Sequence, residues 1–496
     1  MPPPVAPTEF TFNDLLLYVP SFVSDLPALL AAIGWTNREI LDHQDKVAYV
    51  LNRLVTMPVF DSRYQHGAFI PLDTESLIKV LGARYVKWVL DTLLAAGVIE
   101  CDNKYFHRKS KGKALGYRIT EKAQSKAVGL LIFKQETFGK KLFNWSQDQY
   151  VELRKNRFLN RIQRDMSHLR VHFADAIDYN AAVATQTLEF IVERCQTLQV
   201  TAMSKKAYAV VLDEAHELSN QLHLFIHLLD RKNMVKALKK RQQKAPETTV
   251  YDVLTRSTLD ATSCNHMAVE KLHHQDWRLP TRPVKGSRVY TSLTNFSSYL
   301  RQFLYHDQYP HETLVNIDIK NSQPFLLCLL LTQKYLGQSM PADVQQYIAL
   351  TSYGKFYEYV AEAMNVRIAT KRERRDFKSD FFGSIFFCRN QHMEASKCGK
   401  WFKRYFSNVY QLIFDTKAVR YQNLADAMQI QEAQVILDVV VKALHAKKIW
   451  CASIHDSIIC RPGNQEEVAA LMLDAFQGYG VQPSLDREPL RKQLTG

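Results

Sequence analysis

Apolar residues recur every three to four positions between residues 74 and 96, which is the spacing of a helix that buries one face. These apolar positions are Leu77, Ile78, Leu81, Val86, Val89, Leu90 and Leu93. Gly82 interrupts the pattern and Gly97 follows it, so we expect two successive helices, each bounded by a glycine. Two short apolar runs, at 98–101 and 116–119, then predict a pair of strands.

The loop between these two strands is basic, with Lys104, Arg108, Lys109, Lys111 and Lys113. Two helices followed by a basic hairpin are typical of a winged helix, whose wing contacts the nucleic-acid backbone. We therefore expect Lys111 and Lys113 to bind nucleic acid. An interaction module with a solvated wing is the alternative.

The tripeptide Asp73-Thr74-Glu75 resembles the first D-x-E motif of proofreading exonucleases. The same residues also fit a helix N-cap at the start of the first predicted helix. We favour the cap, because the sequence shows no second or third exonuclease motif.

Residues 126–244 have a helical, polar-rich pattern that ends in a basic run at 232–244, shortly before Pro246. We divide the chain into a winged-helix-like domain at 1–125, a helical thumb-like or linker region at 126–265 and a third domain at 266–496. The predicted fold class is α+β and predominantly helical.

Three segments of the third domain carry charged residues in patterns that suggest a catalytic site. The run at 314–319 predicts a buried strand with Asp318 near its end, and a buried acid is costly unless it is paired or metal-bound. At 450–460, apolar residues flank a central His455-Asp456-Ser457, as in a hairpin that holds an acid at its turn.

The third segment, at 371–386, predicts a helix on which Arg374, Lys378, Phe382 and Phe386 follow one stripe at four-residue intervals. Two cations suit a triphosphate, and two aromatic faces suit a base and sugar. Two isolated carboxylates together with such a helix are what two-metal phosphoryl transfer requires.

These segments resemble the motifs of family A (DNA polymerase I-like) nucleic-acid polymerases. The helix matches motif B, R-x-x-x-K-x-x-x-F-G-x-x-Y, without a gap as far as Phe386. The segments at 313–324 and 450–460 resemble motifs A and C, and 286–295 resembles the G-R segment that precedes motif A. The resemblance covers about 278–496, with the four segments in the family's order.

The resemblance implies a right-hand polymerase, with an antiparallel palm sheet, helical fingers and two Mg²⁺ or Mn²⁺ ions. Asp318 and Asp456 would bind the ions, together with the backbone carbonyl of Ile319. Arg374 and Lys378 would hold the triphosphate, with Lys378 a candidate general acid, and Phe382 would pack on the nucleotide. The residues implied to touch primer or template are Arg288, Asn295 and His455.

Four positions depart from the family pattern and concern the choice of sugar. Gln323 stands where the DNA-polymerising members have a glutamate that excludes the 2′-hydroxyl, and Phe386 stands where they have the supporting tyrosine. Phe325 replaces an arginine, and Ser457 replaces the second acid of motif C. His-Asp-Ser also occurs in single-subunit RNA polymerases, so a primase, an RNA polymerase or a template-independent terminal transferase stays an alternative to a DNA polymerase without proofreading.

The formal net charge of +14 favours a polyanionic partner, here primer–template DNA beside nucleoside triphosphates. No apolar run reaches the length of a membrane span, and the start of the chain does not resemble a signal peptide, so we expect a cytoplasmic or nucleoid-associated enzyme. Processivity could depend on a partner protein, since the segment between motifs B and C is short. The rival of another class is a catalytically silent nucleic-acid-binding replication factor.

The eight cysteines include no close C-x-x-C pair, which is typical of a reduced intracellular protein. Cys388, His392 and Cys398 match no common zinc spacing.

Overall fold

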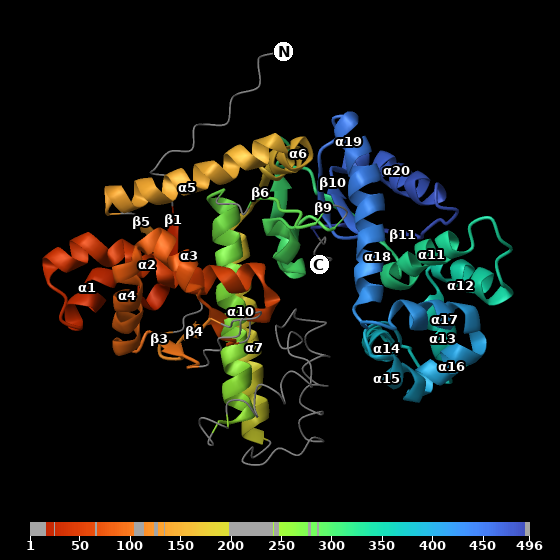
Figure 1. The fold of residues 1–496 in the computed structure, drawn as a ribbon, viewed down its shortest axis with the longest axis horizontal. Helices are drawn as coiled ribbons and strands as arrows, with labels where there is room; N and C mark the ends of the chain where they lie inside the picture. Colours follow the sequence, from red (N-terminus) through yellow and green to blue (C-terminus); the bar gives the residue numbers. More distant parts are fainter. Residues whose placement is uncertain are drawn as a thin grey trace. The chain divides into compact units, whose positions relative to one another are not determined.

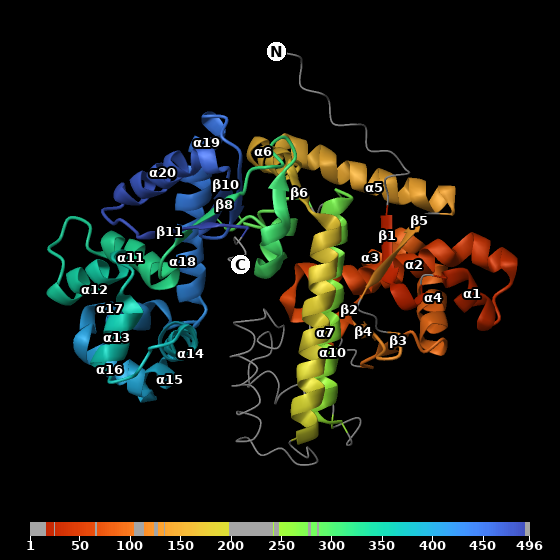
Figure 2. The ribbon, with the colours of Figure 1, turned by 180° about the vertical axis from the view of Figure 1, so that it is seen from behind.

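The computed structural model describes residues 16–491, with gaps at 24, 65–66, 104–113, 124–126, 133, 198–241, 243–247, 276–278 and 285–286. The described residues are predominantly helical, with small antiparallel sheets (Figures 1 and 2). They form two compact units. Unit 1 comprises Met1–Lys155, Val171–Leu279 and Asn295–Phe303, and unit 2 comprises Asn156–Arg170, Pro280–Thr294 and Leu304–Gly496.

Unit 1 combines helices with two small sheets, one ordered β1-β5 and the other β2-β4-β3. Its helices are α1 (Leu26–Ala32), α2 (Asn37–Phe60), α3 (Thr74–Leu81), α4 (Ala83–Ala95), α5 (Glu136–Lys155), α7 (Phe173–Thr197) and α10 (Val250–His273). Its strands are β1 (Leu16–Pro20), β2 (Ile70–Pro71), β3 (Ile99–Cys101), β4 (Gly116–Ile119) and β5 (Val128–Ile132). Short 3-10 turns lie at Ser21–Val23, Ser62–Tyr64 and Ser298–Phe303.

The helix–helix–hairpin pattern predicted for the first quarter of the chain is confirmed as α3, α4, β3 and β4. Gly82 separates the two helices with a φ of 93°, a conformation that costs a glycine little. The Asp73 carboxylate accepts a hydrogen bond of 2.8 Å from the Ser76 amide, so this residue is the N-cap of α3. Lys111 and Lys113 lie outside the described residues.

Strand β5 departs from the sequence prediction, which expected helices from residue 126 onward. It pairs with β1 in antiparallel register, Leu16 opposite Ile132 and Pro20 opposite Val128. A strand of five residues needs a partner to satisfy its backbone groups, and this partner lies more than 100 residues away in the chain. Local periodicity therefore could not reveal it.

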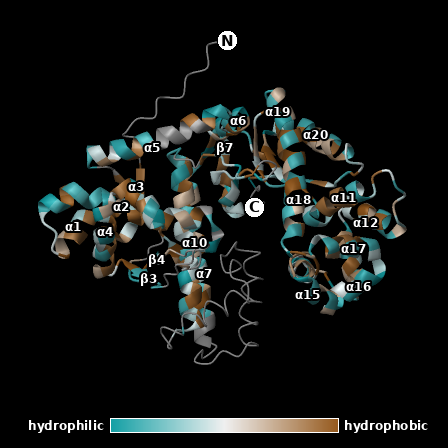
Figure 3. Cartoon of the chain, viewed as in Figure 1, coloured by the Kyte–Doolittle hydropathy of each residue, from teal (hydrophilic) through white to brown (hydrophobic). Residues whose placement is uncertain are grey.

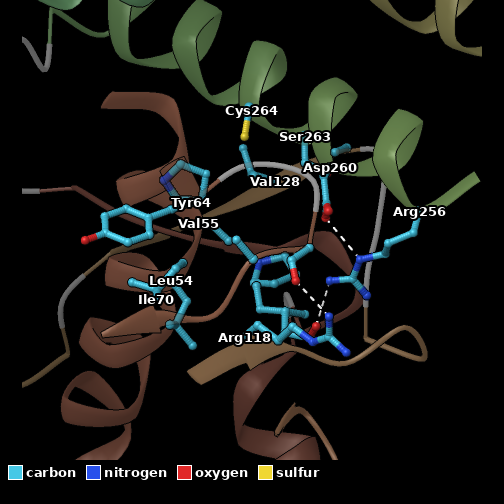
Figure 4. A pocket seen from close by; sticks show the side chains of 16 residues that line it. Leu54, Val55, Tyr64, Ile70, Arg118, Val128, Arg256, Asp260, Ser263 and Cys264 are labelled. Carbon is cyan, nitrogen blue, oxygen red and sulfur yellow. Dashed lines mark hydrogen bonds and ion pairs between the residues drawn. The ribbon is translucent and has the colours of Figure 1, made fainter. Parts of the chain in front are cut away.

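Arg256 connects α10 to the three-stranded sheet β2-β4-β3 of unit 1 (Figure 4). Its Nη2 donates to the Ile119 carbonyl at 2.7 Å, and its Nε pairs with Asp260 Oδ1 at 3.2 Å. The adjacent cavity, which Leu54, Tyr64 and Cys264 help to line, has a volume of about 60 Å³. Ligand pockets typically span roughly 300–1,000 Å³, so this cavity is too small for a nucleotide.

Unit 2 contains a four-stranded antiparallel sheet ordered β11-β8-β10-β9 and a two-stranded sheet of β6 and β7. The strands are β6 (Leu169–Val171), β7 (Leu304–His306), β8 (Val315–Ile319), β9 (Cys451–Ile454), β10 (Ser457–Cys460) and β11 (Leu485–Pro489). The helices are α6 (Arg157–Met166), α11 (Ser322–Lys334), α12 (Ala342–Ser352), α13 (Phe356–Ala363), α14 (Lys371–Phe381), α15 (Asn390–Ala395), α16 (Lys397–Tyr405), α17 (Ser407–Thr416), α18 (Asn423–Ala433), α19 (Lys442–Ala446) and α20 (Gln465–Gln477). Two π-helical segments, Phe382–Phe386 and Gln434–Val441, continue α14 and α18.

Within unit 2, helices α13 to α17 gather at one end, and the four-stranded sheet with α19 and α20 lies toward the other (Figures 1 and 2). Helix α18 and its π-helical continuation run between the two ends. Around the helices of both units, hydrophobic and hydrophilic residues occupy different faces (Figure 3). None of the described helices combines the length and the apolar character needed to cross a membrane.

Candidate active site

The four-stranded sheet positions the two predicted carboxylates on adjacent strands. Burial alternates along β8, so that Val315, Ile317 and Ile319 face the core while Asp318 is only half-buried. Strand β10 pairs with β8 through Ile458 opposite Ile317, and the turn from β9 to β10 consists of His455 and Asp456. The hairpin therefore brings Asp456 to the end of β8 that carries Asp318.

The turn residue His455 has a φ of 56°, in the left-handed region that non-glycine residues seldom adopt. Such a conformation costs of the order of 1–3 kcal/mol and is concentrated at functional sites. Ser457, the next residue, is buried and donates its hydroxyl to the Ile454 carbonyl at 3.0 Å. The Ser457 hydroxyl thus hydrogen-bonds across its own hairpin, at the position where the family A motif C has a second acid.

Asp318 and Asp456 interact strongly. Burial and the neighbouring Asp456 carboxylate raise the pKa of Asp318 to about 7, although the Ile319 amide donates to Asp318 Oδ1 at 3.0 Å. Two carboxylates this close cannot both ionise without a compensating cation. Asp486, directly opposite Asp318 on β11, adds an exposed acid on the same face.

This donor set fits a hard divalent cation such as Mg²⁺ or Mn²⁺. Both side-chain donors are carboxylate oxygens, the ligands that these ions prefer, and the raised pKa of Asp318 reflects a negative charge that an ion would neutralise. Asp318 and Asp456 would hold the ion, as expected from the sequence. The expected contribution of the Ile319 carbonyl stays a prediction.

Lys378, on α14, interacts electrostatically with this pair of carboxylates. Burial and the charge of Arg374 lower the pKa of Lys378, while the carboxylates of Asp456 and Asp318 act in the opposite direction. Lys378 is thus a partly buried lysine whose protonation is influenced by both acids. The predicted grouping of Asp318, Asp456 and Lys378 is therefore present.

Arg374 lies one helical turn before Lys378 and donates hydrogen bonds to two residues that no pattern in the sequence indicated. Its Nε donates to Glu358 Oε1 at 2.6 Å, and its Nη2 donates to Asn321 Oδ1 at 3.2 Å. The Tyr357 ring lies behind both cations, with its centroid 5.5 Å from Arg374 Cζ and 5.9 Å from Lys378 Nζ. Helix α13 thus positions the two cations of α14.

The predicted stripe of two cations and two aromatic rings is present only in part. Phe382 is half-buried, 5.5 Å from Lys378 Nζ, and packs edge-on against Tyr357 at 6.1 Å. The chain then forms a π-helical turn, in which the Phe387 amide donates to the Phe382 carbonyl at 2.8 Å, and Phe386 is fully buried. Phe386 is in ring contact with Phe382 at 5.8 Å and with Phe387 at 6.4 Å.

Arg288 is engaged within the protein. Its Nε and Nη2 donate to the two oxygens of Glu432 at 2.6 and 2.5 Å. Glu432 is fully buried on α18, and burial raises its pKa while Arg288 opposes the rise. Arg282 makes a second two-point pair with Asp438, at 2.9 and 2.7 Å. These two pairs hold the segment at 280–294 against α18 and its π-helical continuation. No pattern in the sequence predicted the role of Glu432.

The other predicted contact residues lie as follows. Gln323 is half-buried in the first turn of α11, which begins immediately after β8. Asn295 is exposed at the end of the 3-10 turn Ser292–Asn295 and belongs to unit 1.

No protein-family model matches this sequence, and a search of curated proteins gives no match.

The carboxylate pair predicts a specific pH dependence of stability. Asp318 binds its proton more tightly in the folded chain than in the unfolded chain, so the free energy of unfolding falls as pH rises from the ordinary Asp range to about 7. In chelator at pH 8, we expect Asp318→Asn to raise the melting temperature by a few °C, since each kcal/mol shifts it by roughly 2–4 °C in a domain of this size. At pH 5 the difference should nearly vanish.

Thermal unfolding at both pH values, with and without Mg²⁺, measures this effect. Mg²⁺ should stabilise the wild type at pH 8 and not the variant. Lower stability of Asp318→Asn at pH 8 would contradict the proposed repulsion.

Proposed function

We propose that this protein is a metal-dependent nucleotidyltransferase, a compact DNA polymerase similar to family A that adds nucleotides to a primer 3′ end under the direction of a template. The observation that carries the proposal is the grouping of Asp318 and Asp456, from adjacent strands, with Lys378 and Arg374 of one helix. Phe382, in the next turn of that helix, supplies a half-buried aromatic ring. The four-stranded sheet would serve as the palm and α14 as part of the fingers.

The reaction joins the 3′-hydroxyl oxygen of the primer to the α-phosphorus of the nucleotide, and it breaks the bond from that phosphorus to pyrophosphate. Two divalent ions held by Asp318 and Asp456 would lower the pKa of the 3′-hydroxyl, whose proton leaves to water, and would neutralise the triphosphate charge. Arg374 would bind the triphosphate with the guanidinium nitrogens that Glu358 and Asn321 leave available. Lys378 would donate a proton to the departing pyrophosphate, which takes the bonding electron pair.

Two features of the structure favour an alternative to strict use of deoxyribonucleotides. Phe386 brings no hydroxyl and is fully buried, and the Ser457 hydroxyl is engaged by its own hairpin. In the family pattern, a glutamate supported by a tyrosine excludes the 2′-hydroxyl. Here Gln323 replaces the glutamate, and no tyrosine stands at the position of Phe386. The second candidate function is synthesis with ribonucleotides, or template-independent extension, on the same site.

Extension of a labelled primer–template by the purified full chain tests the proposal. Templated growth with dNTPs and Mg²⁺ would support a DNA polymerase, and growth with rNTPs or without a template would favour the second candidate. No growth with either ion and either nucleotide class would contradict nucleotidyl transfer and favour a silent nucleic-acid-binding factor.

The Arg374–Glu358 pair gives a prediction about nucleotide binding. Glu358→Gln keeps a hydrogen-bond acceptor for Arg374 and removes a negative charge, whereas Glu358→Ala also removes the acceptor. Both side chains are 39% exposed. Because such pairs contribute roughly 1 kcal/mol at most, we expect the KM for dNTP of Glu358→Ala to exceed that of Glu358→Gln by up to about fivefold.

Steady-state kinetics of primer extension measures this difference, and kcat should change little. Glu362→Ala, an exposed substitution on the same helix, is the matched control. Equal KM values for the alanine and glutamine variants would show that Glu358 does not orient Arg374.

A further inference from the structure

Unit 2 contains a second group of potential metal-ligand side chains, separate from the carboxylates of Asp318 and Asp456. Asp165 comes from α6, His445 from α19 and Cys451 from β9. One ligand atom of each residue lies within 4.8 Å of those of the other two. Carboxylate, imidazole and thiol are all established zinc ligands.

Two of these ligand atoms are buried and face each other without forming a hydrogen bond. Asp165 Oδ2 and His445 Nε2 are 2.8 Å apart, which is an ion-pair distance if the imidazole is protonated, and neither makes a hydrogen bond within the described part of the chain. Asp165 as a whole is 3% exposed. Buried polar atoms are nearly always hydrogen-bonded, so a pair such as this calls for a further partner.

Two contacts hold the rest of Asp165 in place. Arg161 Nε lies 3.4 Å from the other oxygen, Oδ1, and the Trp450 indole donates to the Asp165 carbonyl at 2.7 Å. In metal sites, a carboxylate ligand is typically oriented by such contacts from a second group.

Cys460 lies outside the group of three ligand atoms that are within 4.8 Å of one another, and it is the candidate fourth ligand because of its place on the sheet. It is directly opposite Cys451 in the β9–β10 hairpin, so both side chains lie on the same face of the sheet, and both are buried. Burial raises the pKa of the Cys460 thiol to about 12, and burial together with Asp165 and Cys460 raises the pKa of Cys451 well above its ordinary value. A bound cation would reverse the effect of these neighbours.

We propose that Asp165, His445 and Cys451, with Cys460 as the fourth ligand, form a structural zinc site that fastens α6 to the hairpin of Asp456. A set of two thiolates, one imidazole and one carboxylate suits the tetrahedral preference of Zn²⁺ and disfavours Mg²⁺. The charges also balance. The two positive charges of the ion and the one of Arg161 offset two thiolates and one carboxylate.

Metal analysis and cobalt substitution of the purified full chain test this site. We expect close to one equivalent of zinc per chain. The cobalt-loaded protein should show thiolate-to-cobalt charge-transfer absorption, which Cys451→Ser abolishes and Cys460→Ser weakens. Cys398→Ser, a partly buried cysteine of the same unit, and Asp318→Asn are controls that should leave the spectrum unchanged.

The result is independent of catalysis, because no substrate is present. If Cys451→Ser fails to fold, Asp165→Asn and His445→Gln, together with chelator-induced lowering of the melting temperature of the wild type, replace it. Wild-type zinc content no higher than that of the variants would overturn the proposal and leave an ion-pair network of Asp165, His445 and Arg161. A cobalt spectrum without thiolate bands would overturn the roles of Cys451 and Cys460.

Discussion

Asp456→Asn is expected to abolish primer extension while leaving binding of primer–template DNA nearly intact. The substitution keeps the size and hydrogen-bonding capacity of the side chain at the hairpin turn and removes one of the two charges that would hold the ions in the proposed mechanism. Metal ions stabilise the transition state of phosphoryl transfer by several kcal/mol, so the rate should fall by about 10³-fold or more. Single-turnover incorporation of one dNTP measures the loss, and a binding titration at fixed salt measures the retained affinity.

Asp474→Asn is the matched control for this experiment, because Asp474 is exposed on α20 of the same unit. It should extend primers at the wild-type rate. Incorporation by Asp456→Asn within about tenfold of the wild type would show that the proposed metal site is wrong. Joint loss of incorporation and of DNA binding would indicate instead that the hairpin had lost its structure, which the melting temperature would reveal.

Lys378→Ala is expected to have the second-largest effect, a fall in the incorporation rate of about 10²–10⁴, the range that general acid catalysis contributes. The charges of both carboxylates and of Arg374 act on Lys378, and in the proposed mechanism it protonates the leaving pyrophosphate. Since Arg374 stays in place, the KM for dNTP should change much less than kcat. A variant that raises KM and leaves kcat unchanged would reduce Lys378 to a binding residue.

The pH profile separates proton donation from simple charge. Burial and Arg374 lower the pKa of Lys378, so the protonated form is lost at a lower pH than for an ordinary lysine. The incorporation rate should therefore fall on the alkaline side as Lys378 loses its proton. Lys378→Arg keeps the charge but titrates only far above this range, so this alkaline limb should disappear and kcat should stay reduced. An unchanged limb in Lys378→Arg would assign the titration to another group.

The proposed zinc site shows what the sequence could not reveal. Cys451 and Cys460 are nine positions apart, and Asp165 lies nearly 300 residues earlier in the chain, so no spacing rule connects the set. The cysteine–histidine set that the sequence does present, Cys388, His392 and Cys398, is not among the clusters of potential ligands in the described residues. Only the packing of α6 and α19 against β9 brings Asp165, His445 and Cys451 together, and only the pairing of β9 with β10 sets Cys460 opposite Cys451.

The orientation of the candidate catalytic groups was likewise decided by tertiary contacts. The stripe of Arg374, Lys378, Phe382 and Phe386 follows from helical periodicity, but a π-helical turn ends the regular α-helix after Phe381 and leaves Phe386 in the core. The resemblance implied that Arg288 touches the primer or template. In the structure it pairs with the buried Glu432, whose carboxylate would be costly to bury without a partner.

The sequence by itself determined the local elements whose cause is local. These are α3 and α4 divided by Gly82, the strand that carries Asp318, the helix of Arg374 and Lys378 and the hairpin of Asp456, because periodicity, capping and turn chemistry act over a few residues. Tertiary structure decided which distant groups meet. It paired β1 with β5, set Glu358 and Tyr357 behind the two cations and brought Asp318 close enough to Asp456 to raise its pKa. Those contacts depend on chain segments far apart in sequence, whose proximity is fixed only when strands pair and helices bury their apolar faces.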